Sequence, residues 1–544
     1  MYILGINGGF RAGYQDVSAC LIKDGEVIAA IEEERISRVK FSAGKLPYLA
    51  ILEVLKIANI SIEEVSLVAF HGSTWEADFD KKIETYFLNY FGYSPAIKRF
   101  HHHDCHAAGA FYSSGFEEAL LLTMDNSGDG VSMQIAVGKQ NKIEVLKRFD
   151  RPQSLGLFYS LITQYCGFTK DNEEYKLMGL AAFGDKFKFD FSWLLSVDNG
   201  EYVIDTRYIH TPPPKAPSPH RDEMNFNALF IEKMGFPKRI PHTAITQFYK
   251  DVAASAQYQL EQTILHIAAY YVAKTGIKNI CTAGGVALNC LMSQKLMNAE
   301  FVHHLFVQPA ATDAGISMGA AWSASVENGD LPKAPATAFL GNEFSNEEIE
   351  KTLHICQIVF KKVENKTTLA AIDLAEGKVI AWFQGRMEFG PRALGNRSIL
   401  ASPCFADMQQ TVNQKVKFRE SFRPFGASVL VEEMPVFFEG KEKNAPFMTL
   451  VFDVKEEQKS KIPAVVHADG SCRIQTVSQE DNPLFFQLIT DFKKQSEVGL
   501  LLNTSFNLNH EPIVNTPREA IASFFASGID VLYLGDYRIQ KSTL

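Results

Sequence analysis

A strand–loop–hairpin pattern that occurs twice in the first 150 residues most constrains the fold of this chain. In the first copy, an apolar strand over residues 3–7 runs into a glycine-containing loop, and a hairpin turns at Asp24-Gly25. In the second copy, a strand over residues 119–124 runs into DNSGDG (125–130), and a second hairpin follows. This repeat predicts a duplicated α/β domain with two facing loops. Such loops can grip a nucleotide phosphate chain and its metal, although the pattern alone fits ordinary hairpins equally well.

Hydrophobic periodicity predicts further elements on both sides of a domain boundary. Helical or strand spacing covers residues 47–57, 65–70, 244–274, 277–282, 286–296, 379–383, 427–430 and 499–502. The Pro- and His-rich residues 208–239 indicate a loop or lid rather than core. The prolines within residues 331–335 indicate a linker, so we expect domains at 1–335 and 336–544, the second of the α+β class.

Length, charge and cysteine usage restrict the class of protein. With 544 residues, of which 46% are apolar and 22% charged, the chain fits a soluble multidomain protein. The net charge of -9 argues against bulk binding to nucleic acid or anionic membranes. There is no window typical of a signal peptide or a membrane span, and the eight cysteines form no CxxC pair. We therefore expect a cytoplasmic protein with reduced thiols.

Four histidines between residues 101 and 106 form the densest chemical cluster. On a helix, His102 and His106 stand at i and i+4, so their imidazoles face the same way and can chelate one divalent metal, while His101 and His103 point elsewhere. Imidazole pairs suit Zn, Fe or Ni rather than Mg. Asp313 is a natural third ligand, although its position fits a helix N-cap equally well.

A second cluster is cationic and lies between residues 384 and 424. Its members are Arg386, Arg392, Arg397, Lys415, Lys417, Arg419 and Arg423. Guanidinium forks match phosphate or carboxylate groups, so the run predicts an anion site. The alternative is a solvated face salt-bridged by Glu388 and Glu420. A strand followed by the Gly284-Gly285 pair and a helix start is also favourable for nucleotides, but the signal is weak alone.

Several motifs, in order along essentially the whole chain, resemble those of the NodU/CmcH carbamoyltransferase family. They are HHDCHAAGA (102–110), GGVALN (284–289), PAATDAG (309–315), GRMEFGPRALGNRS (385–398), KFRESFRPF (417–425), HADGSCRIQTV (467–477), LNTSFN (502–507) and EPIVNTPREA (511–520). The family includes O-carbamoyltransferases of nodulation factors, cephamycins and tobramycin. The resemblance implies an N-terminal domain of the actin/heat-shock-ATPase/sugar-kinase type and a C-terminal YrdC-like domain.

The resemblance also implies the chemistry. The YrdC-like domain would convert carbamoyl phosphate and ATP, with Mg, into carbamoyl adenylate, and the N-terminal domain would transfer the carbamoyl group to a hydroxyl at an Fe(II) site, with Zn as the alternative metal. Carried over by motif, His102, His106 and Asp313 are the metal ligands, and Arg423 joins the catalytic set. The predicted ATP- and substrate-binding residues are Asn126, Gly284, Gly285, Asn289, Arg392, Arg397, Ser398, Lys417, Arg419, Arg423, Asn503, Ser505 and Asn507.

Three positions depart from the family pattern. Where the family has a His-Asp pair in the first loop, this chain has Gln15-Asp16. The His of the family's Arg-x-Lys-His motif is replaced by Phe41, and the Gly of its GEPIV motif is replaced by His510. These changes leave open which group deprotonates the acceptor, for which Asp16 is a candidate, and which acceptor is used.

The leading hypothesis is an ATP-dependent carbamoyltransferase that acts on a hydroxyl of a small molecule or glycan. A tRNA threonylcarbamoyl-type modifying enzyme, a non-catalytic nucleotide-binding scaffold and a sugar kinase are the alternatives. The net charge of -9 counts against the tRNA enzyme. The retained histidines and arginines count against the scaffold, and a kinase would leave the C-terminal domain unexplained.

Overall fold

The computed structural model describes residues 1–10, 15–76, 78–210, 224–420 and 422–541. Its contacts divide the chain into two compact units, each described by itself. Unit 1 consists of Met1–Val27, Ala43–Tyr48 and Ile60–Ala334, and unit 2 of Ile28–Ser42, Leu49–Asn59 and Pro335–Leu544. Two N-terminal segments therefore belong to the unit that contains the C-terminus, which the sequence did not predict.

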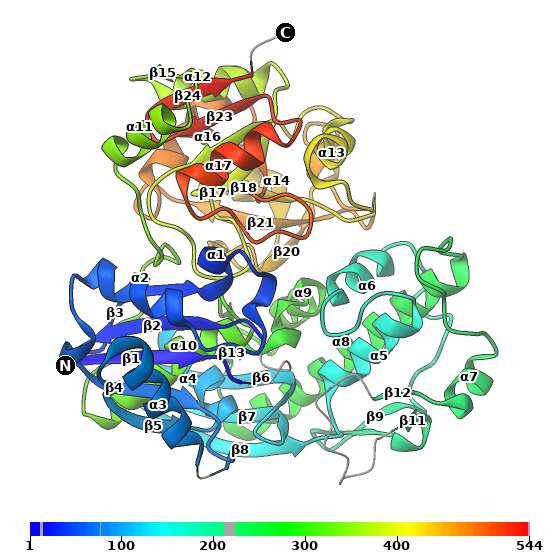
Figure 1. Ribbon diagram of the computed structural model, residues 1–544. Coiled ribbons are helices and arrows are strands. Elements are labelled where there is room, and N and C mark those ends of the chain that lie inside the picture. Colours follow the sequence, from blue (N-terminus) through cyan, green and yellow to red (C-terminus); the bar gives the residue numbers. More distant parts are fainter. Residues whose placement is uncertain (11–14, 77, 211–223, 421, 542–544) are drawn as a thin grey trace. The chain divides into compact units, whose positions relative to one another are not determined.

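Unit 1 contains two sheets with the same strand connections (Figure 1). In the first sheet, β1 pairs antiparallel with β2 and parallel with β4, which pairs parallel with β5. In the second, β6 pairs antiparallel with β7 and parallel with β13, which pairs parallel with β14. The strands are β1 (Tyr2–Asn7), β2 (Ser18–Lys23), β4 (Val65–His71), β5 (Ala96–Phe100), β6 (Glu118–Gly128), β7 (Val131–Lys139), β8 (Lys142–Asp150), β13 (Asn279–Ala283) and β14 (His304–Val307). The matching topology supports the predicted duplication.

Two helices rich in small residues pack against these sheets. Helix α10 (Ile316–Glu327) packs on β1, β2 and β4, helix α4 (His102–Ser114) packs on β6 and β13, and the two helices contact each other. A Cβ at Gly319 would lie 1.8 Å from the Cys105 carbonyl oxygen, and a Cβ at Gly5 1.8 Å from that of Ser317. Glycine at both positions therefore lets backbones approach closely, which sets the place of α4 and of the histidines at its start.

The remaining helices of unit 1 confirm one prediction and correct another. Helix α8 (Gln247–Thr275) matches the expected long helix. Other helices of this unit are α3 (Phe79–Phe91), α5 (Leu155–Tyr165), α6 (Glu174–Ala181) and α9 (Cys290–Asn298). The loop expected over 208–239 lies partly outside the described residues, at 211–223. Its described part includes the β11–β12 ladder (Ile209–His210 with Asn225–Phe226) and α7 (Ala228–Met234). Phe230 of α7 is fully buried, so the expectation that the stretch lies outside the core is wrong for this helix. Among the described residues, no helix is long and apolar enough to cross a membrane.

Unit 2 is built on one ten-stranded mixed sheet of order β15-β24-β23-β16-β17-β22-β18-β21-β20-β19. Its strands are β15 (Lys361–Lys362), β16 (Ile380–Phe383), β17 (Arg397–Ala401), β18 (Gly426–Leu430), β19 (Phe438–Glu439), β20 (Leu450–Val454), β21 (Ser471–Val477), β22 (Leu500–Ser505), β23 (Val531–Leu534) and β24 (Tyr537–Gln540). Helices α12 (Lys366–Ala375), α16 (Pro483–Ser496) and α17 (Pro517–Phe525) pack on it. The α+β prediction therefore holds for this unit.

Segments 28–42 and 49–59 of unit 2 come from the N-terminal part of the chain. They contain the end of strand β3 (Glu26–Glu32), the short helix α1 (Glu33–Ser37) and most of α2 (Tyr48–Ala58). The Glu33 carboxylate accepts hydrogen bonds from the Leu49 and Ala50 N–H groups (3.2 and 2.7 Å), so α1 is tied to the first turn of α2.

Candidate functional site: a His–Asp metal centre and a cationic cluster

The predicted chelating pair lies at the start of α4 and meets two carboxylates. His102 and His106 are buried, and their Nε2 atoms lie 3.4 and 3.5 Å from Asp125 Oδ2. The same nitrogens lie 3.7 and 3.6 Å from Asp313 Oδ1. One ligand atom from each of the four residues lies within 4.8 Å of the others.

The electrostatics of this cluster fit a bound cation. His106 Nε2 is buried and makes no hydrogen bond among the described residues. Burial by itself lowers the pKa of His106, but Asp125 and Asp313 outweigh it and raise that pKa to about 9. The pKa of Asp125 is held well below its usual range because the two histidines outweigh its burial. Two imidazoles and two carboxylates are ligands that Fe(II) or Zn accepts, so the residues present fit such a metal.

Neighbouring groups hold the histidines in place. Asp129 Oδ2 accepts a hydrogen bond from the His102 backbone N–H (2.9 Å) and Asp129 Oδ1 one from Thr74 Oγ1 (2.8 Å), which fixes the first residue of α4. The His103 ring nitrogens bond Thr123 Oγ1 and the Val131 carbonyl (2.7 and 3.1 Å). His103 is therefore a structural residue that points away from the metal centre, as its helical position predicted.

Asp125 is the member of the cluster that sequence reasoning did not assign as a ligand. The segment DNSGDG was expected to be a loop, but β6 continues through Gly128 and only Asp129-Gly130 turn the chain. Asp125 therefore lies on a strand. The sequence did contain a signal, because this Asp directly follows the apolar run over residues 119–124. The competing N-cap role of Asp313 falls to Thr312, whose hydroxyl accepts from the Ala314 N–H (3.3 Å).

Replacing Asp125 by Asn should weaken metal binding by at least the roughly 10- to 100-fold typical of losing a residue that only supports a ligand, because the amide keeps the shape but removes a charge from the ligand set itself. Metal content after dialysis against a weak chelator measures this loss. Asp104→Asn is the matched control, since Asp104 lies on α4 but pairs with Arg148 (2.7 Å) instead. Equal metal in the two variants would exclude Asp125 as a ligand.

The Gly284-Gly285 turn lies beside the metal cluster. Gly284 has φ +88, and a Cβ there would lie 2.1 Å from the Met124 carbonyl oxygen, so only glycine fits. A Cβ on Gly285 would lie 3.3 Å from Asp125 Oδ1. The turn therefore brings backbone next to a carboxylate of the candidate metal centre. The chain then passes through a short 3-10 turn (Gly285–Leu288) before α9, where one helix from 286 had been expected.

The predicted nucleotide residues Asn126 and Asn289 make internal contacts. Asn289 caps α9 by accepting from the Met292 N–H, and its amide exchanges two hydrogen bonds with Gln257 (2.8 and 2.9 Å). Asn126 Nδ2 donates to Asp171 Oδ1 (2.6 Å). The geometry gives Asn289 a structural role, and its nucleotide binding remains only a prediction.

In unit 2, eight of the predicted binding residues fall into two groups. The first is centred on Lys417, which is buried and donates from Nζ to Asn507 Oδ1 (2.8 Å) and the Ser505 carbonyl (2.6 Å). Burial, followed by the charges of Arg419 and Arg423, lowers the pKa of Lys417 well below its usual value. The structure thus brings five of the predicted anion-binding residues together: Lys417, Arg419, Arg423, Ser505 and Asn507. We call this set the cationic cluster.

The second group is internal. Arg397 is fully buried, and its guanidinium donates to the carbonyls of Gln384 and Asn396 (2.7 and 2.9 Å). Ser398 Oγ accepts from the Gly395 N–H (3.0 Å), and Asn503 Nδ2 donates to the Ala393 carbonyl (3.1 Å). These contacts give the three residues a role in shaping the loop over 385–396, and their contact with phosphate stays a prediction.

The alternative of a solvated, salt-bridged face is wrong for Glu388. This residue is 1% exposed, and its Oε1 accepts from the N–H groups of Leu394, Asn396 and Arg397 (2.8, 2.9 and 3.1 Å). Glu388 therefore organises the loop that contains Arg392. Glu420 lies 3.7 Å from Arg423 Nη1, so the second carboxylate does reach its arginine.

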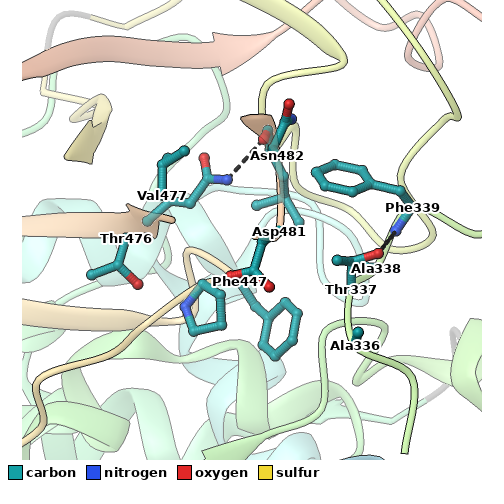
Figure 2. A pocket seen from close by; sticks show the side chains of 12 residues that line it. Ala336, Thr337, Ala338, Phe339, Phe447, Thr476, Val477, Asp481 and Asn482 are labelled. Carbon is teal, nitrogen blue, oxygen red and sulfur yellow. Dashed lines mark hydrogen bonds between the residues drawn. The ribbon is translucent and has the colours of Figure 1, made fainter. Parts of the chain in front are cut away.

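A separate small pocket in unit 2 contains none of the predicted binding residues. Figure 2 shows its lining, in which Phe339 and Thr337 follow the linker and the Phe339 N–H donates to Thr337 Oγ1 (3.3 Å). Phe447 and Asp481 come from other parts of the unit. Leu394 also lines the pocket, so the pocket adjoins the loop over residues 385–396, which we call the arginine loop.

Fold and site together define an α/β protein with a candidate transition-metal centre in one unit and a cationic cluster in the other. Residues 79–322 match the family description Carbamoyltransferase N-terminus, and residues 371–541 match Carbamoyltransferase C-terminus. The chain belongs to the carbamoyltransferase family, which confirms the resemblance drawn from its motifs.

Three relatives illustrate the breadth of the similarity. Nodulation protein NolNO of Sinorhizobium fredii is 36% identical over 100% of this chain and 83% of its own length. Nodulation protein NolO of Bradyrhizobium diazoefficiens is 39% identical over 81% of this chain and 78% of its own. The 3'-hydroxymethylcephem-O-carbamoyltransferase of Amycolatopsis lactamdurans is 32% identical over 68% of this chain and 65% of its own.

Proposed function

We propose that the protein is an ATP-dependent O-carbamoyltransferase that uses carbamoyl phosphate and acts on a hydroxyl of a small molecule or glycan. The observation that carries this proposal is the presence of two different ligand sets, one of histidines and carboxylates in unit 1 and one of Lys and Arg in unit 2. The name of the cephem relative, an O-carbamoyltransferase, supports the acceptor class.

Unit 2 is the proposed site of carbamoyl adenylate formation and the proposed YrdC-like domain. Carbamoyl phosphate and water give carbamate and inorganic phosphate, and a carbamate oxygen then attacks the α-phosphorus of ATP and releases pyrophosphate. These reactants bring several phosphate charges together. The buried Lys417 and its neighbours Arg419 and Arg423 can offset those charges with directed hydrogen bonds, where water would be a weaker partner.

Unit 1 is the proposed site of transfer. The acceptor oxygen attacks the carbamoyl carbon of the adenylate, AMP leaves, and the hydroxyl proton passes to a base. A divalent metal held by His102, His106, Asp125 and Asp313 would supply Lewis-acid stabilisation of the oxyanion that develops. The Gly284-Gly285 backbone, which approaches Asp125, is suited to hold the phosphate end of the adenylate.

Two observations decide the overall reaction. Purified protein with ATP and carbamoyl phosphate should release pyrophosphate, and AMP formation should increase with the correct member of a panel of hydroxyl acceptors. Absence of pyrophosphate in the presence of metal and Mg would exclude the proposed adenylation. Stoichiometric tRNA binding with carbamoylation of a nucleoside would instead favour the tRNA-modifying alternative.

Asp16→Asn should slow acceptor carbamoylation while leaving pyrophosphate release unchanged, because Asp16 is the acid that remains of the first-loop pair. Its carbonyl is held by Asn7 Nδ2 (2.9 Å) and its φ is +53, so the residue has a defined place after β1. Asn also tolerates positive φ, so the fold should be kept. Full activity of the variant on its true acceptor would exclude a base or orienting role for the carboxylate.

A further inference from the structure

The N-terminal segment Ile28–Ser42 forms hydrogen bonds to both the N–H and the carbonyl of Gly390, in the arginine loop of unit 2. Glu32 Oε1 accepts a hydrogen bond from the Gly390 N–H (2.9 Å), and Arg35 Nη2 donates to the Gly390 carbonyl (2.9 Å). Arg35 also pairs with Glu32 (3.1 Å) and with Glu34. Glu32 and Arg35 are only 4% and 3% exposed, so both peptide groups of Gly390 are held by buried charges.

The same segment holds the start of this loop. Arg386 Nη2 donates to the Ile28 carbonyl (3.1 Å), and the Ala30 N–H donates to the Leu340 carbonyl (3.0 Å). Gly390 has φ +119, a conformation that other residues rarely adopt, and Arg392 follows two positions later. The segment therefore contacts the loop at Arg386 and at Gly390, two positions before Arg392.

Arg38, in the same segment, forms hydrogen bonds to a second loop, over residues 507–513. It ends α1 with φ +60 and donates from its guanidinium to the carbonyls of Pro512 and Ile513 (2.8 and 2.6 Å). The preceding loop residue Asn507 accepts from Lys417 and donates to the Glu511 carbonyl (2.7 Å). Arg38 thus bonds the residues that directly follow Glu511, and Glu511 in turn is bonded to Asn507, the partner of Lys417.

We propose that the segment Ile28–Ser42 is a positioning element of the adenylate-forming site, in which Glu32, Arg35 and Arg38 place the two loops that present Arg392 and the Asn507–Lys417 pair. This inference rests on the proposed function. Buried ion pairs contribute little net stability, so the directed hydrogen bonds of these residues to backbone groups matter more for the geometry of the two loops than for the stability of the fold. Misplacing a phosphate-binding loop by about 1 Å can cost about a hundredfold in rate.

The test uses the full chain with Arg38→Gln and Arg35→Lys. Arg35→Lys keeps the charge but loses the fork that contacts Gly390 and both glutamates. Lys56→Gln is the control, since Lys56 is in the same unit, on α2, and its side chain is 73% exposed. Pyrophosphate release from ATP and carbamoyl phosphate gives kcat and KM, and hydrogen exchange is followed over residues 385–397 and 505–515. Metal content and thermal unfolding are measured in parallel.

We expect each arginine variant to lose at least tenfold in kcat for pyrophosphate release and to exchange faster in the loop it holds, with metal content and unfolding temperature close to wild type. Arg38→Gln should affect residues 505–515 more, and Arg35→Lys residues 385–397. Variants that fold, with unaltered kcat and unaltered exchange in these loops, would overturn the inference. If the wild type releases no pyrophosphate, the proposed function fails, and the exchange data alone then decide whether the segment positions the loops.

Discussion

In the Arg423→Ala variant, we expect pyrophosphate release from ATP and carbamoyl phosphate to fall by about a hundredfold or more. A charge-assisted contact to a phosphate in the transition state is typically worth about 3 kcal/mol, which corresponds to roughly this factor. Arg423 belongs to the cationic cluster, where its charge helps lower the pKa of the buried Lys417. Arg392→Ala should show a similar loss. Arg518→Ala, an exposed arginine of the same unit, should not.

The His102→Ala variant should fail at a different step. The candidate metal centre to which His102 belongs lies in unit 1, so the variant should still release pyrophosphate. Acceptor carbamoylation should be lost, and added carbamoyl adenylate should not restore it. The same adenylate should restore transfer in the arginine variants, provided that it enters from solvent. If His102→Ala and Arg423→Ala fail at the same step and respond alike to added adenylate, the assignment of two separate sites is wrong.

The second large effect concerns the metal itself. Purified protein should contain about one Fe or Zn ion, and His106→Ala should lose it, because removing one imidazole from a four-residue set opens the chelate. Elemental analysis measures both. His303→Ala is the control, since His303 is exposed. Equal metal in wild type and His106→Ala would contradict the centre.

Metal affinity should also depend on pH in a definite direction. The metal-free His106 has a pKa raised to about 9 by its two carboxylates, so at neutral pH a metal must displace a proton from it. Apparent affinity should therefore rise with pH between about 7 and 9 and level off above that range. A flat profile would show that His106 is already neutral without metal.

The cationic run shows why a sequence pattern does not reveal the surroundings of each charged residue. Arg397 and Lys417 look alike in the sequence, yet Arg397 is enclosed by carbonyls, whereas Lys417 joins two arginines and the polar residues after β22. Likewise, Glu388 resembles a surface counter-charge but accepts three backbone N–H groups. The surroundings of each charge are set by backbone groups from distant parts of the chain, and the local sequence does not identify those groups.

By itself, the sequence determined the elements and chemistry that depend on near neighbours. Helical spacing alone places His102 and His106 on one face, because residues four apart are neighbours on any helix, and the repeated strand pattern indicates the duplicated sheets. The motif order was sufficient for the family. Only the tertiary structure decided that Asp125 joins Asp313 at the histidines and that Glu32, Arg35 and Arg38 belong to unit 2. These outcomes depend on how strands far apart in the chain pair and pack, and periodicity along the chain does not encode that pairing.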